Sequence, residues 1–488
     1  MSTTTSRAAA RAGTEDGRAR VLVGALVGVV LAVLAIGLWL RAGAGLPMSA
    51  VDEHMHLDTH VRVHDGGYPH RGALMTMDVV RAWACGIGHE AGAAMAPCDH
   101  PDLGPNSLPS GIHTTGYIHY PTYFVAAEGY RWVEESLVDP DSWVDTYRRF
   151  AALVMTVGLL VCLAGARAVG LRGAALVAGT LGPSAAAGIL LFGTVANPQS
   201  AAVLLGALIA WSGLRWMRTG TGFWWLAAAT ALASGVAVTH SLPAGAFMLA
   251  VVAALLLRRG GWHVAGGWEP RWWQLGVLAA IVVAPVVVFG RWISSRATLS
   301  NDELYAFAAL DSWHSVLTGA LQELTILHSP WYAAGSLGGG EGTPLVQRLL
   351  RASVDGLPTW LTVAVFALVV VTAARLVVRL HADRRASAEA PGGPGGSVSA
   401  PGGRRLVSPT ALLTACTLAG IIVYPVLLRV SNAINVGFDF PVVSRYSIGF
   451  TPLLMWLVLL ECRDRPLVTR ALAVLATATP LAIGLAIW

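Results

Sequence analysis

Residues 21–40 read VLVGALVGVVLAVLAIGLWL, an unbroken apolar run without a charged side chain. A helix needs roughly 20 such residues to cross the hydrocarbon layer of a bilayer. The run is too long for a signal peptide and lacks a small-residue cleavage site. It therefore predicts a membrane-spanning helix that remains in the protein.

Similar runs recur along the chain. Of its 488 residues, 55% are hydrophobic and only 12% are charged, whereas soluble domains carry roughly 25% charged residues. A membrane removes the problem of exposing so much apolar surface, because lipid is the solvent for those faces. We therefore predict an all-α polytopic membrane protein with about eleven transmembrane helices. The expected spans lie near 21–40, 148–168, 173–194, 197–217, 222–238, 241–257, 274–290, 359–380, 409–429, 447–462 and 470–487.

The arginines predict how these spans are oriented. The chain contains no lysine, and arginines gather before the first span and in alternate turns. Cytoplasmic loops carry an excess of such residues, so we expect a multi-pass plasma-membrane protein with a cytoplasmic N-terminus and an external C-terminus. The arginines lie beside apolar helices rather than on one face, which argues against a nucleic-acid partner.

Four regions follow from this topology. A cytoplasmic tail (1–20) precedes a transmembrane core (21–380), which includes external loops at 42–147 and 291–358. The first loop has amphipathic stretches that predict short surface helices. Residues 381–408 contain Gly-Gly-Pro-Gly-Gly and predict a flexible cytoplasmic linker, and 409–488 hold the last transmembrane helices.

Two of the five cysteines, Cys85 and Cys98, lie in the first external loop. If that loop is outside the cytoplasm, we expect them to form a disulfide. A paired metal site is the alternative, although the spacing is not that of a zinc knuckle. The other three cysteines lie in or at apolar segments, where we expect them to be inert: Cys162, Cys416 and Cys462.

Asp52 and Glu53 stand side by side near the start of the first external loop. A carboxylate at the lipid surface can act as a general base or hold a divalent cation. Asp52 and Glu53 could therefore bind magnesium or manganese. The alternative is an ordinary helix start with Asp52 as its N-cap.

Histidines are dense just after this pair, at 54, 56, 60 and 64. The pairs 56/60 and 60/64 are four residues apart and would share a helix face. That spacing can bind zinc or copper. The simpler interpretation is an amphipathic surface helix whose polar side is made of histidine.

Four arginines lie at the outward ends of spans, against the general trend: Arg41, Arg291, Arg429 and Arg445. Guanidinium groups match phosphate well, so a lipid-linked phosphate in the outer leaflet would suit them. The alternative is snorkelling to ordinary headgroups.

Three short segments resemble motifs of the GT-C superfamily, the membrane glycosyltransferases that use polyprenyl-phosphate sugars. Asp52-Glu53 with His56 resembles the "DE..H" start of many members. His119-Tyr120-Pro121-Thr122-Tyr123 resembles "HPPLYY", although Tyr120 stands where that motif has proline. Ser444-Arg445-Tyr446 resembles "GRY", and Asn197-Pro198-Gln199 is a looser match to "N.D".

The resemblance implies a GT-C-like fold and an inverting hexosyl- or pentosyltransferase. Asp52 would deprotonate the acceptor hydroxyl, and Glu53 would support it or join a metal site. The implied partners are a polyprenyl-phosphate sugar donor, membrane lipid and an envelope glycan, lipid or protein acceptor. The donor would be bound by His56, His119 and Tyr120 around the sugar and by Arg445 with Arg429 or Arg291 on the phosphate.

Three other interpretations remain open at this point. A transporter or flippase of a lipid-linked envelope intermediate would share the many spans and the outward arginines, and would favour broken helices at mid-membrane. An external metal-binding or sensor protein would use the histidines. A membrane scaffold would need none of these residues for chemistry.

Overall fold

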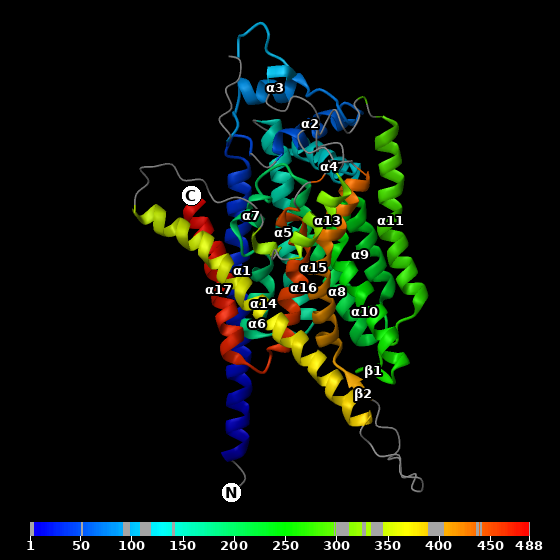
Figure 1. Ribbon diagram of the computed structural model, residues 1–488. Helices are drawn as coiled ribbons and strands as arrows, with labels where there is room; N and C mark the ends of the chain where they lie inside the picture. Colours follow the sequence, from blue (N-terminus) through cyan, green and yellow to red (C-terminus); the bar gives the residue numbers. More distant parts are fainter. Residues whose placement is uncertain are drawn as a thin grey trace, which may run out of the picture.

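The computed structural model describes residues 4–49, 52–90, 98–107, 119–138, 142–296, 298, 312–324, 328–332, 345–388, 405–435, 439 and 442–487. Helices make up nearly all of the secondary structure in these ranges (Figure 1). The prediction of an all-α protein is therefore confirmed.

Seven helices of the described part are long and apolar enough to cross a membrane. Their spanning segments are Val21–Ala42, Trp143–Ala168, Pro198–Thr219, Val238–Arg259, Trp272–Trp292, Gly356–Ala382 and Pro409–Ser431. The elements that contain them are α1 (Thr4–Ala42), α5 (Trp143–Ala168), η4 (Pro198–Ala201) with α8 (Ala202–Thr219), η5 (Val238–Ser241) with α10 (Leu242–Arg259), α11 (Trp272–Ser295), α14 (Leu345–Ala388) and α15 (Pro409–Asn435). These helices indicate a membrane-embedded protein.

The other four predicted spans are shorter or interrupted. Two are shorter apolar helices, α9 (Phe223–Val236) and the Pro466–Ala482 part of α17 (Pro466–Ile487). A third is divided between η8 (Ser444–Phe450) and α16 (Thr451–Glu461). By length and apolarity the described part thus supports seven spans and not eleven.

The predicted span 173–194 is broken in the middle. It consists of α6 (Gly173–Leu181), η3 (Gly182–Ser184) and α7 (Ala187–Leu191). Pro183 cannot donate a backbone hydrogen bond. Two indole N–H groups donate hydrogen bonds to backbone carbonyls near the end of α6. Trp456 Nε1 donates to the carbonyl of Gly179, and Trp331 Nε1 donates to that of Gly182, each at 2.8 Å.

The first external loop contains three helices that lie together at one end of the bundle, α2 (Glu53–His64), α3 (Met77–Ala84) and α4 (Pro121–Leu137), with the short turn η1 (Pro105–Ser107) (Figure 1). The expectation of surface helices holds for α4, which exposes Trp132 and Leu137. It is wrong for α2, whose residues 53–61 are all buried, because partners inside the protein replace water around the Glu53 and Asp58 carboxylates and its histidine rings pack against other aromatic rings.

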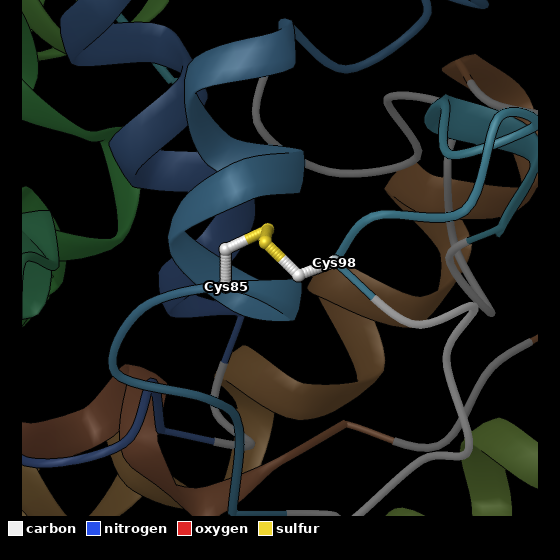
Figure 2. Close-up of a disulfide and its surroundings, with 2 residues drawn as sticks. All are labelled: Cys85 and Cys98. Atoms are coloured by element: carbon white, nitrogen blue, oxygen red, sulfur yellow. A yellow bond between two sulfur atoms is a disulfide. The ribbon is translucent and has the colours of Figure 1, made fainter.

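A disulfide joins Cys85, at the end of α3, to Cys98 (Figure 2). Their Cα atoms are 4.9 Å apart, and the bond ties the end of α3 to the chain 13 residues further on. Residues 91–97 between them lie outside the described part. The remaining three cysteines are buried and free.

The predicted second external loop and linker also contain regular structure. Helix α13 (Trp313–Glu323) and the turn η7 (Pro330–Tyr332) lie in the loop, and α14 begins at Leu345 and continues to Ala388, past the predicted start of the linker. Residues 389–404 lie outside the described part. Beyond them, β2 (Arg405–Val407) pairs in parallel with β1 (Trp262–Val264).

Candidate active site

Asp52 occupies an unusual backbone conformation. It precedes α2 with φ 59° and ψ 13°, and among the described non-glycine residues it alone has a positive φ. Left-handed backbone at a residue with a side chain is held in place by its surroundings and is concentrated at functional sites. This conformation distinguishes Asp52 from the other described non-glycine residues, and its side chain makes no cap hydrogen bond.

The Asp52 carboxylate pairs with Arg445, which lies 393 positions further along the chain at the start of η8. Nη2 of Arg445 donates to Oδ2 of Asp52 at 3.0 Å. The two side chains keep 30% and 21% exposure for Asp52 and Arg445 respectively. The pair is therefore accessible to a ligand, and two of the segments singled out in the sequence meet here.

Two histidines flank this ion pair. His56 lies one turn along α2 from Asp52, and its ring centroid is 4.8 Å from that of His119, which precedes α4. Burial lowers the pKa of His119 to about 4, although Asp52 opposes the shift. Burial also lowers the pKa of His56 well below its ordinary value, and His119 adds to this effect. Both rings are neutral near pH 7.

These depressed pKa values predict that the protein loses stability in mild acid. Between pH of about 4 and 6.5, His119 is protonated in the unfolded chain but neutral in the folded protein. The free energy of unfolding therefore falls as pH falls through this window. We expect a lower thermal unfolding midpoint at pH 5 than at pH 7.5 (roughly the two sides of the unperturbed histidine pKa). A His119→Gln variant should lose part of this dependence, and an unfolding midpoint that rises on acidification would contradict the argument.

A second polar layer lies beneath the first. His240 Nε2 is 3.3 Å from Oε1 of Gln199, and the Asn197 side chain accepts a hydrogen bond from the Gln199 backbone. Nδ1 of His240 and Nδ1 of His56 are buried and have no hydrogen-bond partner in the described part of the chain. Both nitrogens are therefore polar groups of this region that the described side chains leave free.

Glu53 points elsewhere and serves the fold. Its carboxylate accepts from Nε and Nη2 of Arg148 at 2.7 and 2.8 Å, and from the backbone amides of Ser49 and Ala196 at 2.7 and 2.9 Å. The Glu53 and Arg148 side chains are 0% and 2% exposed. Glu53 has no free access to a substrate, so its predicted catalytic or metal-binding role is not supported by this geometry.

The other predicted donor-binding residues are spread over the same end of the bundle. Arg429 is engaged by two carboxylates, Glu323 at 3.2 Å and Asp439, so its charge is already neutralised. Arg291 is exposed on the last turns of α11 and makes no ion pair with a described residue. Tyr120 is buried and stacks on Phe289 of α11 at 4.5 Å. Of the three arginines predicted to hold phosphate, Arg445 is the one that pairs with Asp52.

A metal centre is not assembled from the predicted ligands. His60 stacks on Tyr147 at 4.0 Å and His54 packs edge-on against Trp83, so the histidines of α2 have separate neighbours. Within the described ranges, no group of three or more His, Cys, Asp and Glu side chains is placed to hold a metal ion. Magnesium and manganese prefer several oxygen ligands, and Asp52 alone does not supply them once Glu53 is bound to Arg148.

Two residues of this region were not identified from the sequence alone. Arg148 looks like one more arginine at a span end, and His240 looks like an isolated polar residue in an external turn. A polar side chain at the end of an apolar run was the available signal in both cases. Their partners, Glu53 and Gln199, are 95 and 41 positions away, which no local pattern can show.

Comparison with known proteins finds no protein family that matches the sequence and no curated protein that is significantly similar to it.

Proposed function

We propose that this chain is a membrane glycosyltransferase that moves a sugar from a polyprenyl phosphate to an envelope acceptor, as the GT-C resemblance implies. The observation that carries the proposal is the Asp52–Arg445 pair. A carboxylate suited to deprotonate a hydroxyl and a guanidinium suited to hold a phosphate are 3.0 Å apart, both partly exposed. All four motif-like segments contribute to this region.

The proposed chemistry is a single displacement. Asp52 accepts the proton of the acceptor hydroxyl, and the hydroxyl oxygen attacks the anomeric carbon. The bond from that carbon to the phosphate oxygen breaks with inversion, and its electron pair leaves with the polyprenyl phosphate. Arg445 holds the departing phosphate and stabilises its growing negative charge. Neutral His56 and His119 lie beside the pair and add no competing positive charge.

The side of the membrane is also part of this proposal. The Cys85–Cys98 disulfide lies in the same group of loop helices as Asp52, and disulfides persist in oxidising compartments. The arginine distribution independently favours a cytoplasmic location for the opposite end of the spans. We therefore infer an extracytoplasmic active face on the plasma membrane.

The test of the donor site is a transfer assay in membranes with a panel of labelled polyprenyl-phosphate sugars. Arg445→Lys keeps the positive charge but loses the planar pair of donors. We expect it to lower kcat/KM for the donor about 10- to 100-fold, the value of a charged hydrogen bond, with a loss in kcat because Arg445 stabilises charge that grows in the transition state. Arg463→Lys, an exposed residue paired with Asp464 at the other end of the bundle, is the control. Unchanged donor kinetics in Arg445→Lys would remove Arg445 from the site.

One observation favours transport instead. The break between α6 and α7 resembles the discontinuous helices of transporters. However, the break contains no ionisable residue, and its carbonyls at Gly179 and Gly182 are occupied by indoles. A transporter would move labelled lipid-linked sugar across the vesicle membrane without forming a new glycosidic bond. The same panel of donors therefore distinguishes the two functions.

A further inference from the structure

A cavity of about 220 Å³ lies at the end of the bundle that holds β1 and β2, opposite the loop helices α2, α3 and α4 (Figure 1). Its walls come from α14, from the start of α15 and from the turn that follows α16. Trp262 of β1 and Leu406 and Val407 of β2 close one side. The strand pair thus holds two distant parts of the chain around this space.

Three arginines line the cavity, Arg375 and Arg379 on α14 and Arg465 after α16. Arg375 and Arg379 are four residues apart and share a helix face. None of the three forms an ion pair with another described residue, and all three side chains are exposed. The carboxylate on the lining, Glu461, accepts a hydrogen bond from the Thr410 hydroxyl. The lining therefore carries an excess of positive charge that an anion would neutralise.

The part of the α14 wall that precedes the arginines is mainly apolar. It includes Leu368 and Val371, and Leu368 lies seven residues before Arg375, about 10 Å along the helix at the usual rise per residue. Leu376 and Leu380 add apolar lining beside the arginines. A basic end joined to an apolar wall matches a molecule with an anionic headgroup and a hydrocarbon chain.

We propose that this cavity binds an anionic membrane phospholipid, with its phosphodiester on Arg375, Arg379 and Arg465 and an acyl chain along α14. Basic pockets between membrane helices recognise such headgroups. The lipid would join α14 to the turn after α16. This site is remote from Asp52 and does not depend on the proposed glycosyl transfer.

The test uses the purified full-length protein in detergent and native mass spectrometry with added phosphatidylglycerol or phosphatidylcholine. We expect phosphatidylglycerol to be retained at least tenfold more tightly than phosphatidylcholine. Arg375→Gln with Arg379→Gln should lose at least tenfold in phosphatidylglycerol affinity. Arg258→Gln is the control, because Arg258 pairs with Glu269 outside the cavity lining.

A second variant distinguishes loss of the cavity from loss of surface charge and from misfolding as the cause of weaker lipid binding. Thr372 lies on the cavity lining, and Thr372→Phe fills the space while keeping every arginine. We expect it to lose phosphatidylglycerol binding and to keep its thermal unfolding midpoint. Equal phosphatidylglycerol binding in all variants would overturn the proposal, as would an equal loss in Arg258→Gln. Displacement of the lipid by equimolar inorganic phosphate would show a free-anion site instead and would also overturn it.

Discussion

Asp52→Asn should reduce sugar transfer about 100- to 10,000-fold, the range that a positioned general base contributes. Asparagine is nearly the same size and cannot accept the proton of an acceptor hydroxyl. It also tolerates the left-handed backbone that Asp52 adopts, so we expect the variant to fold. The measurement is the initial rate with a labelled polyprenyl-phosphate sugar, at saturating donor and acceptor.

The control for this experiment lies at the other end of the same helix. Asp65 follows α2 as its C-cap and is exposed, so Asp65→Asn changes the same functional group without touching the Asp52–Arg445 pair. We expect its transfer rate to equal that of the wild type. A wild-type rate in Asp52→Asn, with transfer present, would show that another group is the base.

Glu53→Gln should destabilise the protein by roughly 3–5 kcal/mol, since removing one partner of a buried ion pair leaves the other charge unpaired. Arg148 is 2% exposed and donates Nε and Nη2 to the Glu53 carboxylate at 2.7 and 2.8 Å. Its other partners are the carbonyls of Leu46 and Pro47 and, at 3.9 Å, the carboxylate of Asp145. Water cannot replace the Glu53 carboxylate at such a depth. The measurement is the unfolding of the purified protein in detergent, monitored by helix content.

An exposed ion pair provides the comparison. Glu135 pairs with Arg131 at 2.6 Å but keeps 42% of its surface exposed, and such pairs contribute only about 0–1 kcal/mol. Glu135→Gln should therefore change the unfolding midpoint little. If Glu53→Gln were as stable as the wild type and yet inactive, Glu53 would be a catalytic residue and the structural role argued here would be wrong.

The sequence predicts the membrane-embedded helices well where an apolar run is also a good helix. Residues 21–40 and 409–429 are of this kind, and both lie within long helices of the structure. The run 173–194 is equally apolar, but its backbone is broken at Gly182-Pro183 and is completed by Trp331 and Trp456. Hydropathy measures transfer to lipid and contains nothing about such distant hydrogen bonds.

The site shows a similar division. Sequence patterns select Asp52, His56, His119 and Arg445, which the structure brings to one place. They also group Glu53 with Asp52, because adjacent carboxylates look equivalent in a sequence. The left-handed backbone at Asp52 separates them, so that Asp52 pairs with Arg445 and Glu53 with Arg148. Side-chain direction depends on backbone angles that residue types alone do not specify.

The distance in sequence between Asp52 and Arg445 also determines how late during synthesis their ion pair can form. During synthesis the carboxylate emerges early, and its guanidinium partner follows 393 residues later. At ribosomal rates of about 5–20 residues per second, that interval is roughly 20–80 s. Throughout it, a nascent chain already inserted in the membrane carries Asp52 without Arg445. If the pair catalyses the proposed transfer, premature termination before Arg445 would yield an inserted polypeptide that does not consume lipid-linked sugar.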